Sequence, residues 1–336
     1  MVSMKQIAEL CGVSVATVSK ALNGHTDIGE ETREAVRRTA EELGYMANSA
    51  ARMLKTNRSY NLGVLFEDMG GLGLTHEFFA SVLEGFKAEA AVKGYDITFI
   101  SKNLVDRSST YLQHCNYRGF DGVGIICADF FEKDILDLIR SDIPIATVDH
   151  VFNGIVSVIS DNINGTETLV KYAFERGHSR IAYIYGDTTS VTQNRLAGYY
   201  RACEELGIKV NPQYIRQAHY YDADSSYATT LELISMDKRP TCILFPDDFS
   251  LIGGLKAISE AGLKMPEDIS VMGYDGIIVS QVMSPRITTY RQNASLIGST
   301  AAAKLIDLID HPNTAMRDRI IVEGNLIPGE SVKQLK

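Results

Sequence analysis

Short runs rich in valine and isoleucine alternate with helical segments from about residue 60 onward, and this alternation limits the possible folds more than any other feature. Strands that are apolar along their whole length are typical of parallel sheets covered by helices on both faces. The alternation begins again after about residue 161. We therefore expect two similar α/β units with a ligand cleft between them, where the strands reach their carboxyl ends. The apolar runs of the first series are NLGVLF, YDITFI, FDGVGIIC, IPIATVD and VSVIS.

The first 46 residues have a different pattern, which predicts three short amphipathic helices. Ser3 and Gln6 have the spacing of a capping box at the start of the first helix. Ser14 is expected to cap a second helix over 15–22, and a third helix is expected over about 31–43. Two short helices joined by a glycine-containing turn and followed by a third form a helix-turn-helix domain, whose second helix enters the DNA major groove. On this pattern alone, a small helical bundle that does not bind DNA is an equal alternative.

The charge is unevenly distributed along the 336 residues. The whole chain has a net charge of -9, which by itself argues against a nucleic-acid-binding protein. Residues 1–60, however, carry eight Lys or Arg and seven Asp or Glu, so the acidity lies in the remainder. A nearly neutral N-terminal domain can still bind phosphates if its basic residues share one face. The length fits one small domain followed by a larger α/β unit.

Sequence signals for catalysis, metal binding and export are missing. The five cysteines are odd in number and none has CxxC spacing, which favours a reducing cytosol over disulfides or a zinc site. We find no phosphate-binding glycine loop, nucleophile elbow or zinc-protease motif, and therefore expect no enzyme activity, no cofactor and no metal. The chain has no apolar signal region and no run of about 18 apolar residues, so we expect a cytoplasmic protein without a membrane partner.

Longer strings of residues resemble the LacI/GalR family of bacterial regulators. In the N-terminal part these are MKQIAELCGVSVATVSKALNG and ETREAVRRTAEELGYMANSAARMLK. The likeness continues through RLAGYYRAC, DDFSLIGGLKAISEAGLKMPEDISVMGYDG and PRITTYRQN, so it covers most of the chain. It implies an α/β protein in which a three-helix helix-turn-helix domain and a hinge helix precede two doubly wound α/β lobes of the periplasmic-binding-protein type.

The resemblance also implies domain boundaries. The helix-turn-helix domain is expected to span 1–46, the hinge helix and linker 47–59, and the effector-binding domain 60–336. Within that domain, the chain is expected to cross between two lobes three times. The expected N-lobe takes about 60–160 and 291–322, and the C-lobe about 161–290 and 323–336.

Candidate DNA-contacting residues follow from the second helix. By resemblance, Val15 and Ala16 occupy positions that read base edges, and as small apolar residues they suit thymine methyl groups. Lys20 is expected on the same exposed face, where it can donate to guanine O6 and N7. Hydroxyl and amide side chains are suited to phosphate oxygens, which fix position without reading sequence; the alternative for Thr17 and Ser19 is a solvated helix surface. This polar group comprises Ser14, Thr17, Ser19 and Asn23.

A second group of DNA contacts is expected in the hinge. Asn48 can cap a short helix that has few apolar anchors and should order only against its twin and DNA. By resemblance, paired hinge helices lie in the minor groove, and Leu54 is the apolar wedge that opens a base step. Ala47 stands where the family usually has proline, which puts the stiffness of the hinge in doubt. Arg52 and Lys55 complete the hinge residues expected to contact DNA.

Candidate ligand-contacting residues come from strand ends and matched positions. By resemblance, Asp275 accepts hydrogen bonds from ligand hydroxyls and Arg195 donates to ligand oxygens, a combination that suits a polyol. Asp149 and Asp247 also follow strands and are expected at the same cleft. Phe78, rather than Phe79, and Tyr221 are expected to stack on the ligand, because the spacing of Phe79 with Val82, Phe86 and Ala90 predicts a core stripe.

The sequence therefore predicts a homodimeric transcription regulator, most simply a repressor, whose partners are double-stranded operator DNA and a small effector, a carbohydrate by default. A regulator of a non-sugar effector, such as a nucleobase or phosphorylated metabolite, is the alternative. A solute-binding protein without a regulatory role would need an export signal and no DNA-reading domain, and an enzyme would need a catalytic constellation.

Overall fold

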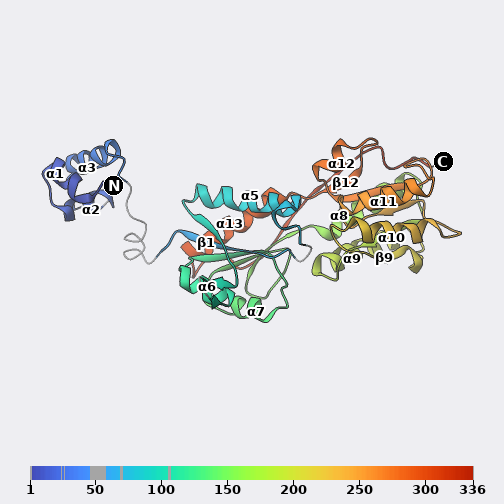
Figure 1. Ribbon diagram of the computed structural model, residues 1–336, viewed down its shortest axis with the longest axis horizontal. Coiled ribbons are helices and arrows are strands. Elements are labelled where there is room, and N and C mark those ends of the chain that lie inside the picture. Colours follow the sequence, from blue (N-terminus) through green and yellow to red (C-terminus); the bar gives the residue numbers. More distant parts are fainter. Residues whose placement is uncertain are drawn as a thin grey trace. The chain divides into compact units, whose positions relative to one another are not determined.

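The computed structural model describes residues 2–23, 25, 27–45, 58–68, 71–104 and 107–335. The chain forms two compact units, Met1–Ser59 and Tyr60–Lys336. The first is helical and the second contains both large sheets (Figure 1). None of the helices in the described part of the chain is long and apolar enough to cross a membrane.

The helical unit contains three helices in its described residues: α1 (Met4–Cys11), α2 (Val15–Leu22) and α3 (Glu30–Glu42). The expected capping box is confirmed, because the Ser3 side chain accepts from the Gln6 backbone and the Gln6 side chain accepts from the Ser3 backbone. The third helix begins and ends one residue before the predicted bounds. The helices enclose a small core of six buried side chains, Ile7, Ala8, Val18, Ala21, Val36 and Ala40.

The first large sheet has the strand order β13-β7-β6-β5-β1-β2, and all of its neighbouring strands are parallel. This explains the continuous apolar runs in the sequence, since successive side chains point to opposite faces and both faces are covered. The strands are β1 (Asn61–Phe66), β2 (Asp96–Phe99), β5 (Gly122–Cys127), β6 (Ile145–Val148), β7 (Val156–Ser160) and β13 (Arg319–Val322). A separate two-stranded sheet pairs β3 (Asn103–Leu104) with β4 (Arg107–Ser108).

The second large sheet has the order β14-β12-β11-β10-β8-β9. Its neighbours are parallel except for the antiparallel pair at the edge, β12 with β14. The two sheets therefore repeat one doubly wound plan, as the family resemblance implies, and the restart of the sequence pattern predicts two similar units. The strands are β8 (Ile181–Tyr185), β9 (Ile215–Gln217), β10 (Cys242–Leu244), β11 (Ser270–Asp275), β12 (Thr288–Arg291) and β14 (Asn325–Ile327).

Helices cover both faces of each sheet (Figure 1). In the lobe of the first sheet, α5 (Glu77–Val92) and α13 (Ala294–Asp310) cover one face, and α6 (Tyr111–Arg118) and α7 (Lys133–Ile139) the other. The lobe of the second sheet has α8 (Asn162–Glu175) and α9 (Ser190–Glu205) on one face, and α10 (Ala223–Ile234) and α11 (Ser250–Glu260) on the other. The short elements are α12 (Ile278–Val282), η1 (Gly73–Thr75) and η2 (Pro212–Tyr214).

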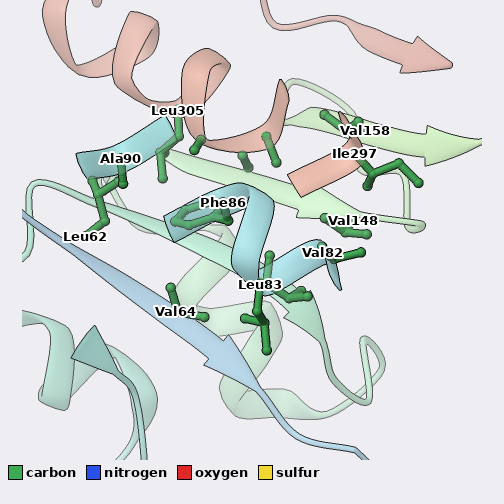
Figure 2. Packing of buried hydrophobic residues seen from close by; sticks show 14 of the residues in the cluster. Leu62, Val64, Val82, Leu83, Phe86, Ala90, Val148, Val158, Ile297 and Leu305 are labelled. Atoms are coloured by element: carbon green, nitrogen blue, oxygen red, sulfur yellow. The ribbon is translucent and has the colours of Figure 1, made fainter. Parts of the chain in front are cut away.

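The core of the first lobe lies between α5, α13 and the sheet. Figure 2 shows Phe86 of α5 among apolar side chains of the strands, such as Val64 and Val148, and near Leu305 of α13. The two helices pack closely because α13 carries Gly298, where an added Cβ atom would lie 1.8 Å from the Val82 carbonyl oxygen. Close packing of this kind leaves no room for one more methyl group.

The chain passes from one large sheet to the other three times, after β7, after β12 and after β13. Two of these connections contact each other, since the Ser160 hydroxyl donates to the Gln292 side-chain oxygen. Each lobe is therefore assembled from segments far apart in the sequence, and three short connections join the lobes. Such connections are where two packed bodies can change their relative angle.

Candidate functional site: a DNA-facing helix and a cavity between two lobes

The first candidate surface is the exposed side of α2. Val15 keeps 46% of its surface exposed even though it is apolar, and Ala16 and Lys20 are exposed beside it. Val18 and Ala21, on the opposite side of the helix, are buried in the core. The core therefore fixes which side of α2 faces outward, and that side carries the residues that sequence analysis assigned to base reading.

The polar residues of α2 also have structural roles. The Ser14 side chain caps the helix by accepting from the Thr17 backbone at 3.0 Å, and the two hydroxyl oxygens lie 2.9 Å apart. The Asn23 side chain donates back to the Ser19 carbonyl oxygen at the other end of the helix. Ser19 itself is partly buried. Contacts of these four residues with phosphate are not tested by the structure and stay predictions.

Lys20 has a partner that sequence analysis did not anticipate. Its Nζ atom lies 2.6 Å from Oδ2 of Asp27, and both side chains are about half exposed. The pair lowers the pKa of Asp27, chiefly through the hydrogen bond from Lys20. A base contact by Lys20 would require this exposed ion pair to open, which is a small cost because exposed pairs contribute little.

The hinge residues named above, Asn48, Arg52, Leu54 and Lys55, lie outside the described residues, as does Ala47. Their roles stay predictions.

The second candidate site is a cavity of about 350 Å³ in the α/β unit. Residues that follow the carboxyl ends of strands from both sheets line it, so the cavity lies between the lobes. A crevice at this edge of a doubly wound sheet is the usual position for a ligand. Its lining includes five of the six predicted ligand-contacting residues, Phe78, Asp149, Arg195, Tyr221 and Asp275.

Arg195 on α9 is the most heavily bonded of these residues. Its Nε donates to Oδ1 of Asn162 at 2.8 Å, and one terminal nitrogen donates to the Pro246 carbonyl oxygen, also at 2.8 Å. The guanidinium carbon lies 3.6 Å from the ring centre of Tyr274. The other terminal nitrogen is 3.9 Å from Oδ1 of Asp275. These contacts hold the guanidinium rigidly at the cavity wall, with one edge directed to the carboxylate.

Asp149 and Asp275 enter the cavity from opposite lobes. One oxygen of Asp149 accepts from the Ser160 backbone at 2.7 Å, and one oxygen of Asp275 accepts from the Gln292 amide at 2.6 Å. The second oxygen of each accepts no hydrogen bond from any described residue. Burial raises the pKa of Asp149, and it raises the pKa of Asp275 to about 7, against the opposing effect of Arg195.

Backbone strain gathers at the same place. Four non-glycine residues among those described have positive φ, and three of them line the cavity: Asp149 (52°), Tyr221 (51°) and Asp275 (99°). Such conformations cost about 1–3 kcal/mol each and persist only where surrounding contacts enforce them. They cluster at functional sites more often than elsewhere, which supports a binding role for this cavity.

Asp247 does not line the cavity, contrary to the expectation from its place after a strand. It is 1% exposed, and its oxygens accept from the Tyr221 backbone, the Ser250 backbone and the Ser250 hydroxyl. The residue therefore holds Tyr221 and the start of α11 in place. Strand β10 ends at Leu244, so Asp247 lies in the loop three residues beyond the strand. Its side chain bonds to Tyr221 and Ser250 of the same lobe and does not reach the cavity.

The prediction that Phe78, and not Phe79, faces the ligand cavity was partly wrong. Both rings line the cavity, but Phe78 is only 7% exposed and belongs to the core with Val82 and Phe86, whereas Phe79 is only partly buried. Helix α5 begins at Glu77, so Phe78 and Phe79 both lie in its first turn, where the cavity meets the core of the lobe. Helical periodicity predicts which side of a helix is buried, but it cannot predict which buried residues of the first turn also reach a cavity at the end of the helix.

Several lining residues were not among the predicted ligand contacts. The loops after β5 and β6 place the rings of Phe130 and His150 in parallel, 4.2 Å apart. From opposite lobes, the rings of His76 and Tyr221 approach to 3.4 Å. Gln292 and Asp187 also line the cavity. A polar or aromatic residue directly after a strand was the available signal for Asp187 and Gln292, since each follows β8 or β12 within two residues.

The described residues contain no group of three or more His, Cys, Asp or Glu side chains placed to bind a metal ion. The five cysteines are all free thiols. Burial raises the pKa of Cys127, which lines the cavity, to about 12, so it stays a neutral thiol there. The cavity is thus equipped to bind and orient a small molecule through carboxylates, a guanidinium and aromatic faces.

Comparison with known proteins agrees with both units. Residues 3–48 match the family described as bacterial regulatory proteins, lacI family, and residues 170–332 match the periplasmic binding protein-like domain. The chain is 30% identical to the ribose operon repressor of Haemophilus influenzae over 100% of both chains. It is 29% identical to the HTH-type transcriptional repressor PurR of Pasteurella multocida over 99% of both. Among solved structures, the lac repressor dimer bound to operator and the anti-inducer ONPF is similar, with a TM-score of 0.80, 25% identity and 99% coverage of both chains.

Proposed function

The chain belongs to the LacI family of bacterial regulatory proteins, and we propose that it is a repressor whose affinity for operator DNA is set by a polyhydroxylated small molecule bound between its two lobes. The observation that carries this proposal is the cavity, where carboxylates and a guanidinium from two lobes meet aromatic faces. Carboxylate oxygens accept from hydroxyl groups and a guanidinium donates to ring oxygens, so the set suits a sugar.

The DNA-binding part of the proposal rests on α2. Its outward side carries Val15, Ala16 and Lys20, which are suited to thymine methyl groups and guanine, and its ends carry hydroxyl and amide groups suited to phosphate. The similar lac repressor structure is a dimer on operator DNA. We propose that this chain also acts as a homodimer, which would place two copies of α2 on a pseudo-palindromic site.

Ligand control requires a ligand that binds one arrangement of the lobes better than the other. The described structure contains direct contacts between lobes that a ligand can add to. The Ser190 hydroxyl donates to the Asp149 carbonyl oxygen at 3.0 Å, and the Ile278 backbone donates to Oε1 of Glu77 at 2.9 Å. A molecule that bridges Asp149 and Asp275 would favour the closed arrangement, and we propose that this bias reaches the DNA-binding unit through the hinge.

A non-sugar effector is the second candidate. The relative named PurR and the aromatic faces of the cavity make a nucleobase the most reasonable choice within that class. A phosphorylated metabolite is disfavoured because aspartates outnumber the single arginine in the lining. The carboxylates of Asp149 and Asp275 favour a ring with several hydroxyl groups over a flat base.

Gel-shift titration tests the proposal directly. The purified full-length protein is titrated onto the DNA upstream of its own operon, with a scrambled DNA of equal length as the control, and with and without each member of a panel of sugars and nucleobases. We expect a specific shift whose midpoint changes with at least one sugar. The absence of a specific shift under every ligand condition would contradict the proposal, and a response to nucleobases alone would replace the sugar by the second candidate.

A further inference from the structure

The charges around the cavity do not balance. Five aspartates line it, and Arg195 is the only lysine or arginine among the described lining residues. Two histidines also line it, but burial lowers the pKa of both, that of His76 to about 4, so they are neutral at pH 7. Asp187 is paired with His219, whose Nδ1 lies 2.6 Å from its Oδ1, so the negative charge that Arg195 has to offset is chiefly that of Asp149 and Asp275 when both are ionised. The aspartates are Asp68, Asp129, Asp149, Asp187 and Asp275.

Arg195 cannot neutralise the whole set. Its guanidinium already donates to Asn162 and Pro246, and it stands 3.9 Å from Asp275, which is longer than a hydrogen bond. Arg195 is thus the one described guanidinium beside Asp275, and its charge also lowers the pKa of Asp149 against the effect of burial. The pKa of Asp275 reflects this: burial raises it, Arg195 lowers it, and the charges of Asp247 and Asp149 raise it again.

Asp149 and Asp275 are the two carboxylates to which a positively charged ligand group would bind. Asp149 and Asp275 come from opposite lobes, and the second oxygen of each is not used by any described residue. A group that donates to both oxygens would bridge the lobes. A protonated amine has three donors and one positive charge, so it can satisfy both carboxylates at once, whereas a hydroxyl has one donor and no charge.

A metal ion does not fit this position, because no cluster of three or more ligating side chains is found among the described residues. The surrounding faces instead suit an organic cation. Phe79, Tyr221 and Phe130 line the same cavity, and aromatic faces attract ammonium groups most strongly where water is excluded. Carboxylates with aromatic faces are the combination that recognises an amine on a carbon skeleton.

We propose that the effector is a polyhydroxylated ring bearing a protonated amine, which is held between Asp149 and Asp275, and that sugar acids and sugar phosphates are rejected. This inference rests on the proposed function and narrows it from sugars in general to amino sugars. It also assigns Asp149 a specific role as the carboxylate that separates an amino sugar from its parent sugar.

Calorimetric titration of the full-length protein at pH 7 with matched ligand sets tests the inference. Each set contains a parent hexose (glucose, galactose or mannose), its 2-amino and 6-amino derivatives, the corresponding N-acetyl compound, the uronic acid and the 6-phosphate. In at least one set we expect an amino sugar to bind at least about tenfold more tightly than its parent, and the acid and phosphate to show no binding. The N-acetyl compound separates charge from shape, because it keeps the nitrogen substituent but not the positive charge.

Binding of a parent sugar or N-acetyl compound as tight as that of the amine, or binding of an acid or phosphate, would overturn the inference and leave the proposed function standing. If no compound of any set binds, the sugar class itself fails and the inference fails with it. The Asp149→Asn variant should reduce the ratio of amine to parent affinity by at least about fivefold, whereas Asp142→Asn, an exposed aspartate of the same lobe outside the cavity, should leave the ratio unchanged. An unchanged ratio in both Asp149→Asn and Asp275→Asn would also overturn the inference. Because the amine and the parent sugar are both measured on the same variant, partial unfolding of that variant lowers both affinities and leaves their ratio unchanged.

Discussion

In the helical unit, the candidate DNA-contacting residues that the structure describes lie on one short stretch of chain, from Ser14 to Asn23, and most of them are exposed. In the α/β unit, the candidate ligand-contacting residues extend from Asp68 to Gln292, and the most strongly bonded of them, Arg195, is 4% exposed. The first surface is built by one helix on a small core. The second exists only when two sheets, joined by three connections, are both folded.

The two surfaces should respond differently to substitution. A change on the outward side of α2 removes a contact with DNA but few contacts within the protein, so it should alter binding more than stability. A change in the cavity removes a partner from a desolvated charge, so it should alter both ligand binding and the stability of the α/β unit. The four predictions below test whether the two units separate in this way.

The largest effect is expected from Arg195→Met, which keeps the side-chain volume but removes the charge. Asp275 then loses the guanidinium 3.9 Å from its Oδ1, Asp149 loses a nearby positive charge, and breaking a buried ion pair of this kind costs about 3 kcal/mol or more. Ligand affinity should fall at least about a hundredfold, measured by calorimetry, and the α/β unit should melt at a lower temperature.

The control for this substitution is Arg180→Met, which removes an exposed arginine of the same lobe and should change neither quantity. DNA binding without ligand should survive Arg195→Met. Its loss in a variant that is still folded would show that the cavity and the DNA-facing helix are not separable.

The next largest effect is expected on the pH dependence of the free energy of unfolding, and it should be confined to the α/β unit. The pKa of Asp275 is about 7 in the folded chain against an ordinary value of 3.8, so between about pH 4 and pH 7 the folded state binds more protons than the unfolded state. The contribution of this group to the free energy of unfolding therefore falls as pH rises through that window, by at most about 4 kcal/mol, and is constant above it.

Chemical denaturation of the ligand-free protein and of Asp275→Asn at several pH values measures this contribution. The stability of the variant relative to the parent should rise between about pH 4 and pH 7 and then level off. Asp142→Asn provides the baseline for an exposed aspartate. A difference that does not change with pH would show that the Asp275 carboxyl group keeps its ordinary pKa in the folded chain.

Val18→Ala tests whether the helical unit can lose stability while the α/β unit keeps its ligand affinity. Val18 is fully buried in a core of only six side chains, and removing its two methyl groups should cost about 2 kcal/mol, a large part of the stability of so small a unit. Operator affinity should fall, while ligand affinity measured by calorimetry stays at the level of the parent protein. Val15→Ala, on the exposed side of the same helix, should change the melting of the unit by less than Val18→Ala. A fall in ligand affinity with Val18→Ala would contradict the separation of the two units.

The smallest effects are expected from the exposed pair Lys20 and Asp27. Lys20→Ala should change the base preferred at one position of each half-site, by about tenfold, because a good contact to guanine discriminates by about 1–3 kcal/mol. Asp27→Asn should strengthen operator binding less than tenfold, since it frees Lys20 and removes a negative charge. Selection from a randomised operator library measures the first and a gel shift the second. Uniform weakening by Lys20→Ala, with no change of base preference, would make it a phosphate contact instead.

The helix caps and the α/β alternation could be predicted because each depends on neighbours in the sequence. Ser3 and Gln6 form their capping box within one turn, and Ser14 caps α2 through Thr17, three residues away. Arg195 and Asp275 were predicted from the resemblance, and both line the cavity. The position of Asp247 was predicted wrongly, because the course of a loop after its strand depends on partners such as Tyr221 and Ser250 that the sequence does not place beside it.

The sequence by itself determined the alternation of strands and helices, its restart in a second unit and the side of α2 that faces outward, because local periodicity and capping govern all three. The doubly wound plan followed only from the resemblance to the family. Only the tertiary structure decided that Asp275 lies beside Arg195, that Phe78 and Phe79 both reach the cavity, and that His76 meets Tyr221 across it. These contacts join residues far apart in the chain, and their energies depend on burial and on distances that are set only when the two sheets fold against their helices and against each other.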